Sequence, residues 1–192
     1  MSPLILASSS RYRAELLKKL QLDFITCSRG VDETPHPQEP ADALAQRLSI
    51  SKAQAVAPAY PDHLIIGSDQ VAVCNDVLLG KPGNRANAFR QLKAQSSQKV
   101  TFYTGLCVLN SRTGQTWTDL DVCHVYFREL SESQIEHYLD VDQPFDCAGS
   151  FKSEGYGISL FSKIEGEDPN ALIGLPLIKL IGLLNQCGLA IP

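Results

Sequence analysis

The strongest candidates for chemistry in this sequence stand near its N-terminus, where a short apolar run meets hydroxyl groups and cations. Residues 4–7 are Leu-Ile-Leu-Ala, and Ser8 and Ser10 belong to the serine triplet that follows them. Hydroxyls and backbone N–H groups at the start of a helix form an anion site, to which Arg13 can add two donors. A capped helix with a solvated basic first turn would explain the same residues.

A second candidate is Asp69, in the stretch IIGSDQ. It follows an apolar strand in which Gly67 would permit close approach and Ser68 supplies a polar end. A carboxylate at the carboxyl end of a strand in an α/β sheet lies where ligands usually bind. Asp69 could therefore hold a metal or activate a water as general base. The alternative is an aspartate that forms a turn.

Three further stretches carry weaker signals. Asp32 and Glu33 lie in VDETP, an acidic loop bounded by proline, for which a solvated surface loop is the simpler interpretation. Lys81 in GKP is either a fixed cation or part of a turn. Glu154 in CAGSFKSEGYG lies among glycines that would let the backbone approach a ligand. The phosphate-binding patterns G-x-x-x-x-G-K-[ST] and G-x-G-x-x-G are absent.

The elements that must position these side chains follow from hydrophobic periodicity and turn residues. Helices are predicted where apolar residues recur at helical spacing, at residues 11–20, 41–57, 84–95, 131–139 and 170–188. Strands are predicted at short apolar or alternating runs, at residues 4–7, 22–26, 63–73, 99–110, 115–130 and 155–166. Hairpins and strand–helix alternation together indicate an α/β protein with a mixed sheet. We expect a single domain over residues 1–192, with two lobes around a cleft.

The composition of the 192 residues is that of an ordinary soluble protein. A formal net charge of −4 disfavours a nonspecific nucleic-acid binder. No apolar run has the length of a membrane span and no basic leader precedes the first apolar stretch, so we expect a cytoplasmic protein. The six cysteines form no C-x-x-C pair and the four histidines no ligand-like spacing, so no zinc site is expected.

In chain order, several stretches resemble the motifs of the Maf nucleotide pyrophosphatases: LILASSSRYRAELL, VDETP, KA at 52–53, IIGSDQ, GKP, TFYTGL, AGSFKSEG and IEGEDPNALIGLPL. The resemblance runs over nearly the whole chain. It implies an α/β fold like that of the inosine triphosphate pyrophosphatases. It also implies hydrolysis of a nucleoside triphosphate to the monophosphate and pyrophosphate, with a divalent cation, Mg²⁺ or Mn²⁺, as cofactor.

The resemblance further implies roles for individual residues. Asp69 would be the proton acceptor that activates water, and Glu33 and Asp69 would hold the metal. The side chains that bind the phosphates would be Ser8, Ser10, Arg13, Lys52 and Lys81. A triphosphate brings about four negative charges. Arg13, Lys52, Lys81 and the metal could offset them as further charge develops on the leaving pyrophosphate.

Two departures from the common family pattern bear on the choice of base. Many members read S-P-R-R after the hydroxyls, where this chain has Arg11 and Tyr12 instead of the proline and the first arginine. Members that act on thymidine or uridine triphosphate carry glutamine where this chain has Glu154. The combination found here resembles the branch that hydrolyses 7-methyl-GTP to 7-methyl-GMP and pyrophosphate.

These substitutions have a physical interpretation. A tyrosine face attracts the cationic 7-methylguanine ring by about 0.5–2 kcal/mol, whereas an arginine would repel it. A carboxylate can accept both N–H donors on the pairing edge of guanine, but it faces repelling carbonyls on thymine or uracil. We therefore interpret Tyr12 as the platform for the base, Glu154 as the reader of its edge, and Gln70 as a secondary contact to base or sugar. A tyrosine that merely packs on its helix is the alternative for Tyr12.

Two other functions stay open at this point. One is the same chemistry on dTTP, UTP, CTP or another modified nucleotide. The other is a nucleotide-binding regulator of cell division with little catalysis. Besides the nucleotide, the expected partner is a second copy of the chain, since the resemblance implies a homodimer and the long hairpin at 99–130 offers surface for it. No nucleic-acid or membrane partner is expected.

Overall fold

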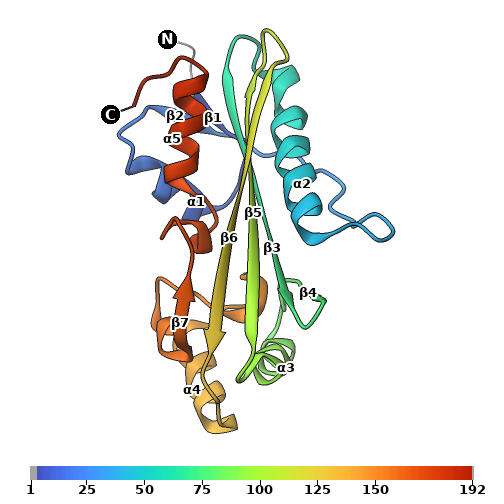
Figure 1. Cartoon of the computed structure of the whole chain (residues 1–192), viewed down its shortest axis with the longest axis vertical. Coiled ribbons are helices and arrows are strands. Elements are labelled where there is room, and N and C mark those ends of the chain that lie inside the picture. Colours follow the sequence, from blue (N-terminus) through green and yellow to red (C-terminus); the bar gives the residue numbers. More distant parts are fainter. Residues whose placement is uncertain (1–3, 192) are drawn as a thin grey trace. The chain divides into compact units, whose positions relative to one another are not determined.

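The computed structural model describes residues 4–191 (Figure 1). The helices are α1 (Arg11–Lys18), α2 (Ala41–Val56), α3 (Arg85–Gln95), α4 (Glu132–Asp142) and α5 (Leu177–Gln186). The strands are β1 (Leu4–Leu6), β2 (Phe24–Thr26), β3 (Leu64–Cys74), β4 (Val77–Leu79), β5 (Lys99–Asn110), β6 (Thr116–Phe127) and β7 (Phe161–Glu165). Within residues 4–191, each helix is too short or too polar to cross a bilayer.

The strands form one mixed sheet, which confirms the predicted α/β class. Their order is β2-β1-β3-β5-β6-β7, and β4 pairs with β3 outside this path. Strand β1 pairs in parallel with both β2 and β3, with Leu4 opposite Phe24 on one side and Leu64 on the other. The β3–β4 and β6–β7 pairs are antiparallel. Crossover helices between parallel strands and tight hairpins between antiparallel ones explain why both sequence patterns occur together.

The chain divides into two compact units, each built from separate stretches. Among the described residues, unit 1 comprises 4–70, 103–121 and 168–191, and unit 2 comprises 71–102 and 122–167. Strands β3, β5 and β6 each begin in one unit and end in the other.

Unit 1 is layered, because the side chains of its strands alternate between two faces. Leu4 and Leu6 of β1 pack with residues of α1 and α5, and Ile5 between them packs with residues of α2. Figure 1 shows α1 and α5 together on one side of β1 and α2 near β3. Each face of the sheet segment thus buries its own apolar cluster.

Helix α2 approaches the sheet closely at two glycines. A Cβ atom at Gly67 of β3 would lie 2.1 Å from the carbonyl oxygen of Ser49, and one at Gly105 of β5 would lie 2.4 Å from that of Ala45. Both obstacles are helix backbone, which cannot move aside as a flexible side chain can. Glycine at these two positions therefore sets how near α2 lies to the strands.

Unit 2 has an aromatic core. Four phenylalanine rings pack edge to face with centroid separations of 4.8–5.6 Å: Phe102, Phe127, Phe151 and Phe161. Helix α4 begins with a capping box, in which Ser131 and Gln134 each bond the other's backbone N–H. The buried Tyr138 of this helix accepts a hydrogen bond from the backbone N–H of Lys152 at 3.0 Å.

Two predicted elements begin much later in the chain than expected. The strand predicted at 155–166 begins only at Phe161, because Tyr156–Leu160 forms a 3₁₀ turn. The helix predicted at 170–188 begins only at Leu177, after Pro176. Ala171–Ile173 is a separate 3₁₀ turn, which Gly174 ends in the left-handed region at φ 116°. Proline suits the N-terminal border of a helix rather than its interior, so the apolar pattern before it was not helical.

Replacing Gly67 with alanine should destabilise the protein, because the new Cβ would collide with the backbone of α2. Overpacking of this kind costs about 1–3 kcal/mol in the free energy of unfolding. Denaturant titration checks the change. Gly182→Ala in α5 is the matched control: its Cβ meets no atom within 4 Å, and alanine in a helix should add up to about 1 kcal/mol of stability. A Gly67→Ala protein as stable as the wild type would contradict the close packing.

Candidate active site

Lys52 joins two carboxylates in unit 1. Its Nζ lies 2.7 Å from Glu33 Oε1 and also contacts Asp69 Oδ1. The Lys52 and Asp69 side chains are 17% and 11% exposed, whereas Glu33 is 60% exposed. Two of the three groups are thus largely shielded from water, where an ion pair is less screened than on the surface. Three residues predicted from separate stretches of the sequence meet at one ammonium group.

The close approach of α2 to β3 explains why Lys52 reaches Asp69. Asp69 follows Gly67 by two residues on β3, and Lys52 follows Ser49 by three on α2. Because Gly67 lies against the Ser49 carbonyl, the two side chains extend from neighbouring backbone segments. The close approach that the sequence predicted at Gly67 is thus an approach of α2 to the strand.

The serine triplet forms the start of α1, as predicted. Ser10 is the N-cap, and its Oγ accepts a hydrogen bond from Arg13 N at 3.4 Å. Ser8 is buried, and its Oγ accepts one from Ser10 N at 3.1 Å. Both hydroxyl oxygens therefore stabilise the backbone turn. Each hydroxyl keeps a proton that can be donated to an anion.

Arg13 is held by the loop before α5. Its Nε donates to the carbonyl oxygen of Gly174 at 2.8 Å, and Ser68 Oγ donates to the same oxygen at 3.0 Å. Burial lowers the pKa of the Arg13 guanidinium, while the charges of Asp69 and Glu33 act in the opposite direction. Arginine stays cationic against such burial. Its charge therefore lies within electrostatic reach of both carboxylates.

A buried aspartate shapes the loop that presents this carbonyl. Asp168 is 2% exposed, and its carboxylate accepts hydrogen bonds from Asn170 N at 2.8 Å and Ile178 N at 2.5 Å. It spans the segment from the 3₁₀ turn to the first turn of α5. A Cβ at Gly174 would lie 3.3 Å from Arg13 Nε, so glycine also leaves room for the guanidinium.

Tyr12 is half-buried on α1 and contacts its neighbour Arg11. The Arg11 guanidinium lies 4.8 Å from the centre of the Tyr12 ring, and its Nη2 donates to the Tyr12 hydroxyl at 2.9 Å. The ring therefore already binds a cation through its face. Its assignment as the platform for a base stays a prediction.

Gln70 faces the same loop as Arg13. Its Nε2 donates to the carbonyl oxygens of Ala171 at 2.9 Å and Leu172 at 3.2 Å, and to Thr104 Oγ1 at 3.1 Å. Thr104 Oγ1 in turn lies 3.3 Å from the Ala171 carbonyl. The amide nitrogen of Gln70 is thus engaged within unit 1, which leaves its carbonyl oxygen as the group that could contact a base or sugar.

Lys81 and Glu154 belong to unit 2. Lys81 is exposed, in the turn between β4 and α3. Glu154 is exposed too, in a loop that α4 holds: Asp142 Oδ2 accepts from Gly157 N at 3.0 Å, and the Asp142 carbonyl accepts from Lys152 Nζ at 2.7 Å. The participation of these two side chains in the site of unit 1 stays a prediction.

The residues present fit a divalent cation. Glu33 and Asp69 place carboxylate oxygens around a single cationic atom, Lys52 Nζ. Such hard oxygen donors suit Mg²⁺ or Mn²⁺. Within residues 4–191 no group of three or more His, Cys, Asp or Glu side chains has metal-binding geometry. A protein share of two carboxylates agrees with Mg²⁺ chemistry, in which water and phosphate oxygens commonly complete the shell.

Sequence reasoning missed the contributions of Thr104 and Gly174. Both lie in stretches that carry the family resemblance, TFYTGL and NALIGLPL. A lone threonine hydroxyl and a backbone carbonyl give no signal of their own, because every chain contains many of each. Only the register of the loop against Arg13 and Gln70 reveals what they do.

Comparison with known proteins places these features in a family. A family model described as Maf-like protein matches residues 3–187. Relatives from Colwellia psychrerythraea, Alcanivorax borkumensis and Vibrio vulnificus are each 54% identical over 98% of this chain, and cover 94%, 96% and 96% of their own lengths. Each of the three carries the name 7-methyl-GTP pyrophosphatase.

Solved structures give a weaker likeness. The Ham1 protein of Staphylococcus aureus has a TM-score of 0.48 at 14% identity, over 66% of this chain and 72% of that one. Protein VC0702 of Vibrio cholerae has a TM-score of 0.49 at 10% identity, over 97% and 92%. Likeness at this level supports no conclusion about function. The family model and the relatives support a firmer conclusion, because they span nearly the whole chain. The protein belongs to the Maf-like protein family.

Proposed function

We propose that this protein hydrolyses 7-methyl-GTP to 7-methyl-GMP and pyrophosphate. The observation that carries the proposal is the meeting of Glu33 and Asp69 on the Lys52 ammonium, within electrostatic reach of Arg13. Carboxylates that can accept a proton and cations that can offset phosphate charge are what anhydride hydrolysis requires. Relatives of this chain with more than half of their residues identical carry the name of this activity.

Asp69 is the proton acceptor in this proposal. Lys52 engages its Oδ1, and among residues 4–191 no group donates a hydrogen bond to its Oδ2. Oδ2 takes a proton from the attacking water as the oxygen of that water bonds to the α-phosphorus. The bond from the α-phosphorus to the bridging oxygen breaks, and pyrophosphate leaves with the electron pair. Lys52 and Arg13 offset the negative charge that gathers on the phosphates.

We expect Glu33 and Asp69 to hold a divalent cation as cofactor. When bound, Mg²⁺ or Mn²⁺ would supply Lewis-acid polarisation of phosphate oxygens. Lys52 lies between the same two carboxylates, so it balances their charge. The remaining phosphate contacts assigned to Ser8, Ser10 and Lys81 are part of the proposal.

The choice of base rests on Tyr12 and Glu154. The face of a tyrosine ring attracts positive charge. A 7-methylguanine ring carries such a charge, and a neutral pyrimidine does not. Glu154 would then accept the two N–H groups of the guanine edge. Assembly as a homodimer remains a prediction of the family resemblance, and cytoplasmic location remains a prediction from the sequence alone.

Asp69→Asn should lower kcat by at least about 10²-fold, because asparagine cannot accept the proton and general base catalysis typically contributes that much. Pyrophosphate release from 7-methyl-GTP with Mg²⁺ or Mn²⁺ measures it. Asp62→Asn is the matched control: Asp62 is exposed, pairs only loosely with Arg112, and has a positive φ that asparagine tolerates. Undiminished turnover by Asp69→Asn would rule out Asp69 as the base.

The double variant Tyr12→Arg, Glu154→Gln should shift preference from 7-methyl-GTP towards dTTP and UTP. The new arginine would repel the methylated purine, and glutamine can pair with the edge of a pyrimidine. The ratio of kcat/KM values across a nucleotide panel measures the shift. Tyr12→Phe serves as control, since it keeps the ring and loses only the hydroxyl that Arg11 binds.

Two results of that panel would count against the proposal. Wild-type turnover of dTTP or UTP as fast as that of 7-methyl-GTP would refute the proposed substrate. Nucleotide binding without pyrophosphate release would favour the alternative of a nucleotide-binding regulator.

A further inference from the structure

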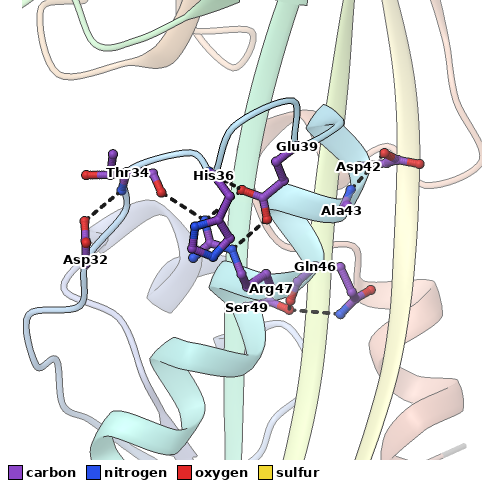
Figure 2. Close-up of polar contacts among 9 residues, drawn as sticks. All are labelled: Asp32, Thr34, His36, Glu39, Asp42, Ala43, Gln46, Arg47 and Ser49. Atoms are coloured by element: carbon purple, nitrogen blue, oxygen red, sulfur yellow. Dashed lines mark hydrogen bonds and ion pairs between the residues drawn. The ribbon is translucent and has the colours of Figure 1, made fainter.

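Besides the ion pair between Lys52 and Glu33, the Arg47 side chain of α2 fastens the loop that carries Glu33 at two further points. Figure 2 shows the Arg47 guanidinium between two points of the loop at residues 31–40. Its Nη2 donates to the Thr34 carbonyl oxygen at 3.1 Å, one residue after Glu33. At the other end of the loop, its Nε and Nη2 donate to the two carboxylate oxygens of Glu39 at 2.6 and 2.9 Å.

The Arg47–Glu39 pair has the geometry of a strong ion pair. Two parallel N–H donors meet two carboxylate oxygens, which fixes orientation as well as distance. The side chains are 27% and 9% exposed. Arg47 holds the pKa of Glu39 at about 2, first through this hydrogen-bonded contact. Because the pKa of Glu39 is lowered, the stabilisation from this pair is fully present above the ordinary pKa of a glutamate and is lost as pH falls towards 2. The pair therefore persists at neutral pH.

Contacts inside the loop carry this anchoring towards Glu33. Asp32 Oδ1 accepts from Thr34 N at 2.9 Å, and Glu39 Oε2 accepts from His36 N at 3.0 Å (Figure 2). Three prolines restrict the rest of the backbone, at positions 35, 37 and 40. Glu33 therefore lies between two residues, Asp32 and Thr34, that are joined by a hydrogen bond.

Arg47 and Lys52 share one rigid element. They are five residues apart on α2, which corresponds to about 7.5 Å along the helix axis. The loop is thus fixed to the same helix that presents the ammonium group to Glu33 and Asp69. Any displacement of the loop relative to α2 would change the distance between Glu33 and Lys52.

We propose that Arg47 is a positioning residue for Glu33: by clasping Glu39 and the Thr34 carbonyl, it sets where the Glu33 carboxylate meets Lys52 and Asp69. This inference rests on the proposed function, because it gives Arg47 an effect on pyrophosphate release that is exerted through Glu33. A merely structural ion pair at the surface would contribute little to stability and nothing specific to the reaction.

A double-mutant cycle separates these roles. In the wild-type background, Arg47→Ala should lower kcat/KM by about tenfold or more, as small misplacements of catalytic groups do. In a Glu33→Ala background, the same change should lower kcat/KM by less than about twofold, because the group that Arg47 positions is already absent. Arg112→Ala is the matched control: Arg112 is exposed, lies 3.8 Å from Asp62, and takes no part in the site.

Two further variants test the clasp itself. Glu39→Ala removes the partner and leaves the Arg47 charge, so it should reproduce the loss of Arg47→Ala. Arg47→Lys keeps the charge and loses the two parallel donors, so it should recover only part of the activity. Equal losses from Arg47→Ala in both backgrounds, full activity of Glu39→Ala, or full activity of Arg47→Lys would each overturn the proposal.

Hydrogen exchange distinguishes failure of this inference from failure of the proposed function. If the wild-type protein releases no pyrophosphate, the proposed function fails, and the exchange of backbone amides in residues 31–40 still tests the clasp. Arg47→Ala should speed that exchange by about tenfold or more relative to Arg112→Ala, because the loop loses its contacts with Arg47 at both Thr34 and Glu39. Equal exchange in the two variants would show that Arg47 does not hold the loop.

Discussion

The site depends on one ammonium group placed between two carboxylates. Glu33 comes from a proline-rich loop, Asp69 from a strand and Lys52 from a helix, so no local stretch of sequence could assemble them. Without Lys52, the charges of Glu33 and Asp69 would lack the cation that both of them contact. Two such carboxylates close together are unfavourable unless a cation offsets them. The proposed binding of phosphates and a metal ion at this place would depend on the same balance of charges.

That arrangement requires backbone contacts that leave no room for side chains. Gly67 lets α2 lie against β3, and Gly174 leaves space for the Arg13 guanidinium while its carbonyl accepts from Arg13 and Ser68. Interiors are packed so tightly that one added methyl group cannot be absorbed by backbone. The electrostatics of the site are therefore a consequence of packing distances that glycine permits.

The sequence was informative where residue type alone decides the role. The start of α1 at the serine triplet and the hairpin at 99–130 depend on neighbours in the chain, and both were predicted. The meeting of Glu33, Lys52 and Asp69 was predictable only through the family resemblance. The roles of Arg47 and Gly174 were not, because they depend on pairings over 8 and 161 residues that no local pattern marks. The helix predicted at 170–188 was too long, because the apolar pattern continues on both sides of Pro176 whereas the helix begins only after it.

Helix α2 contributes both to the packing of unit 1 and to the candidate site. It carries Lys52, anchors the Glu33 loop through Arg47, and rests on Gly67 and Gly105. A shift of this helix would therefore move the ammonium group and the loop together, keeping Lys52 near Glu33 while both leave Asp69 on β3. Disturbances beneath α2 should separate Asp69 from its partners, whereas disturbances at Arg47 should separate Glu33. The two effects differ because Lys52 and Glu33 would move with α2, whereas Asp69 would stay with β3.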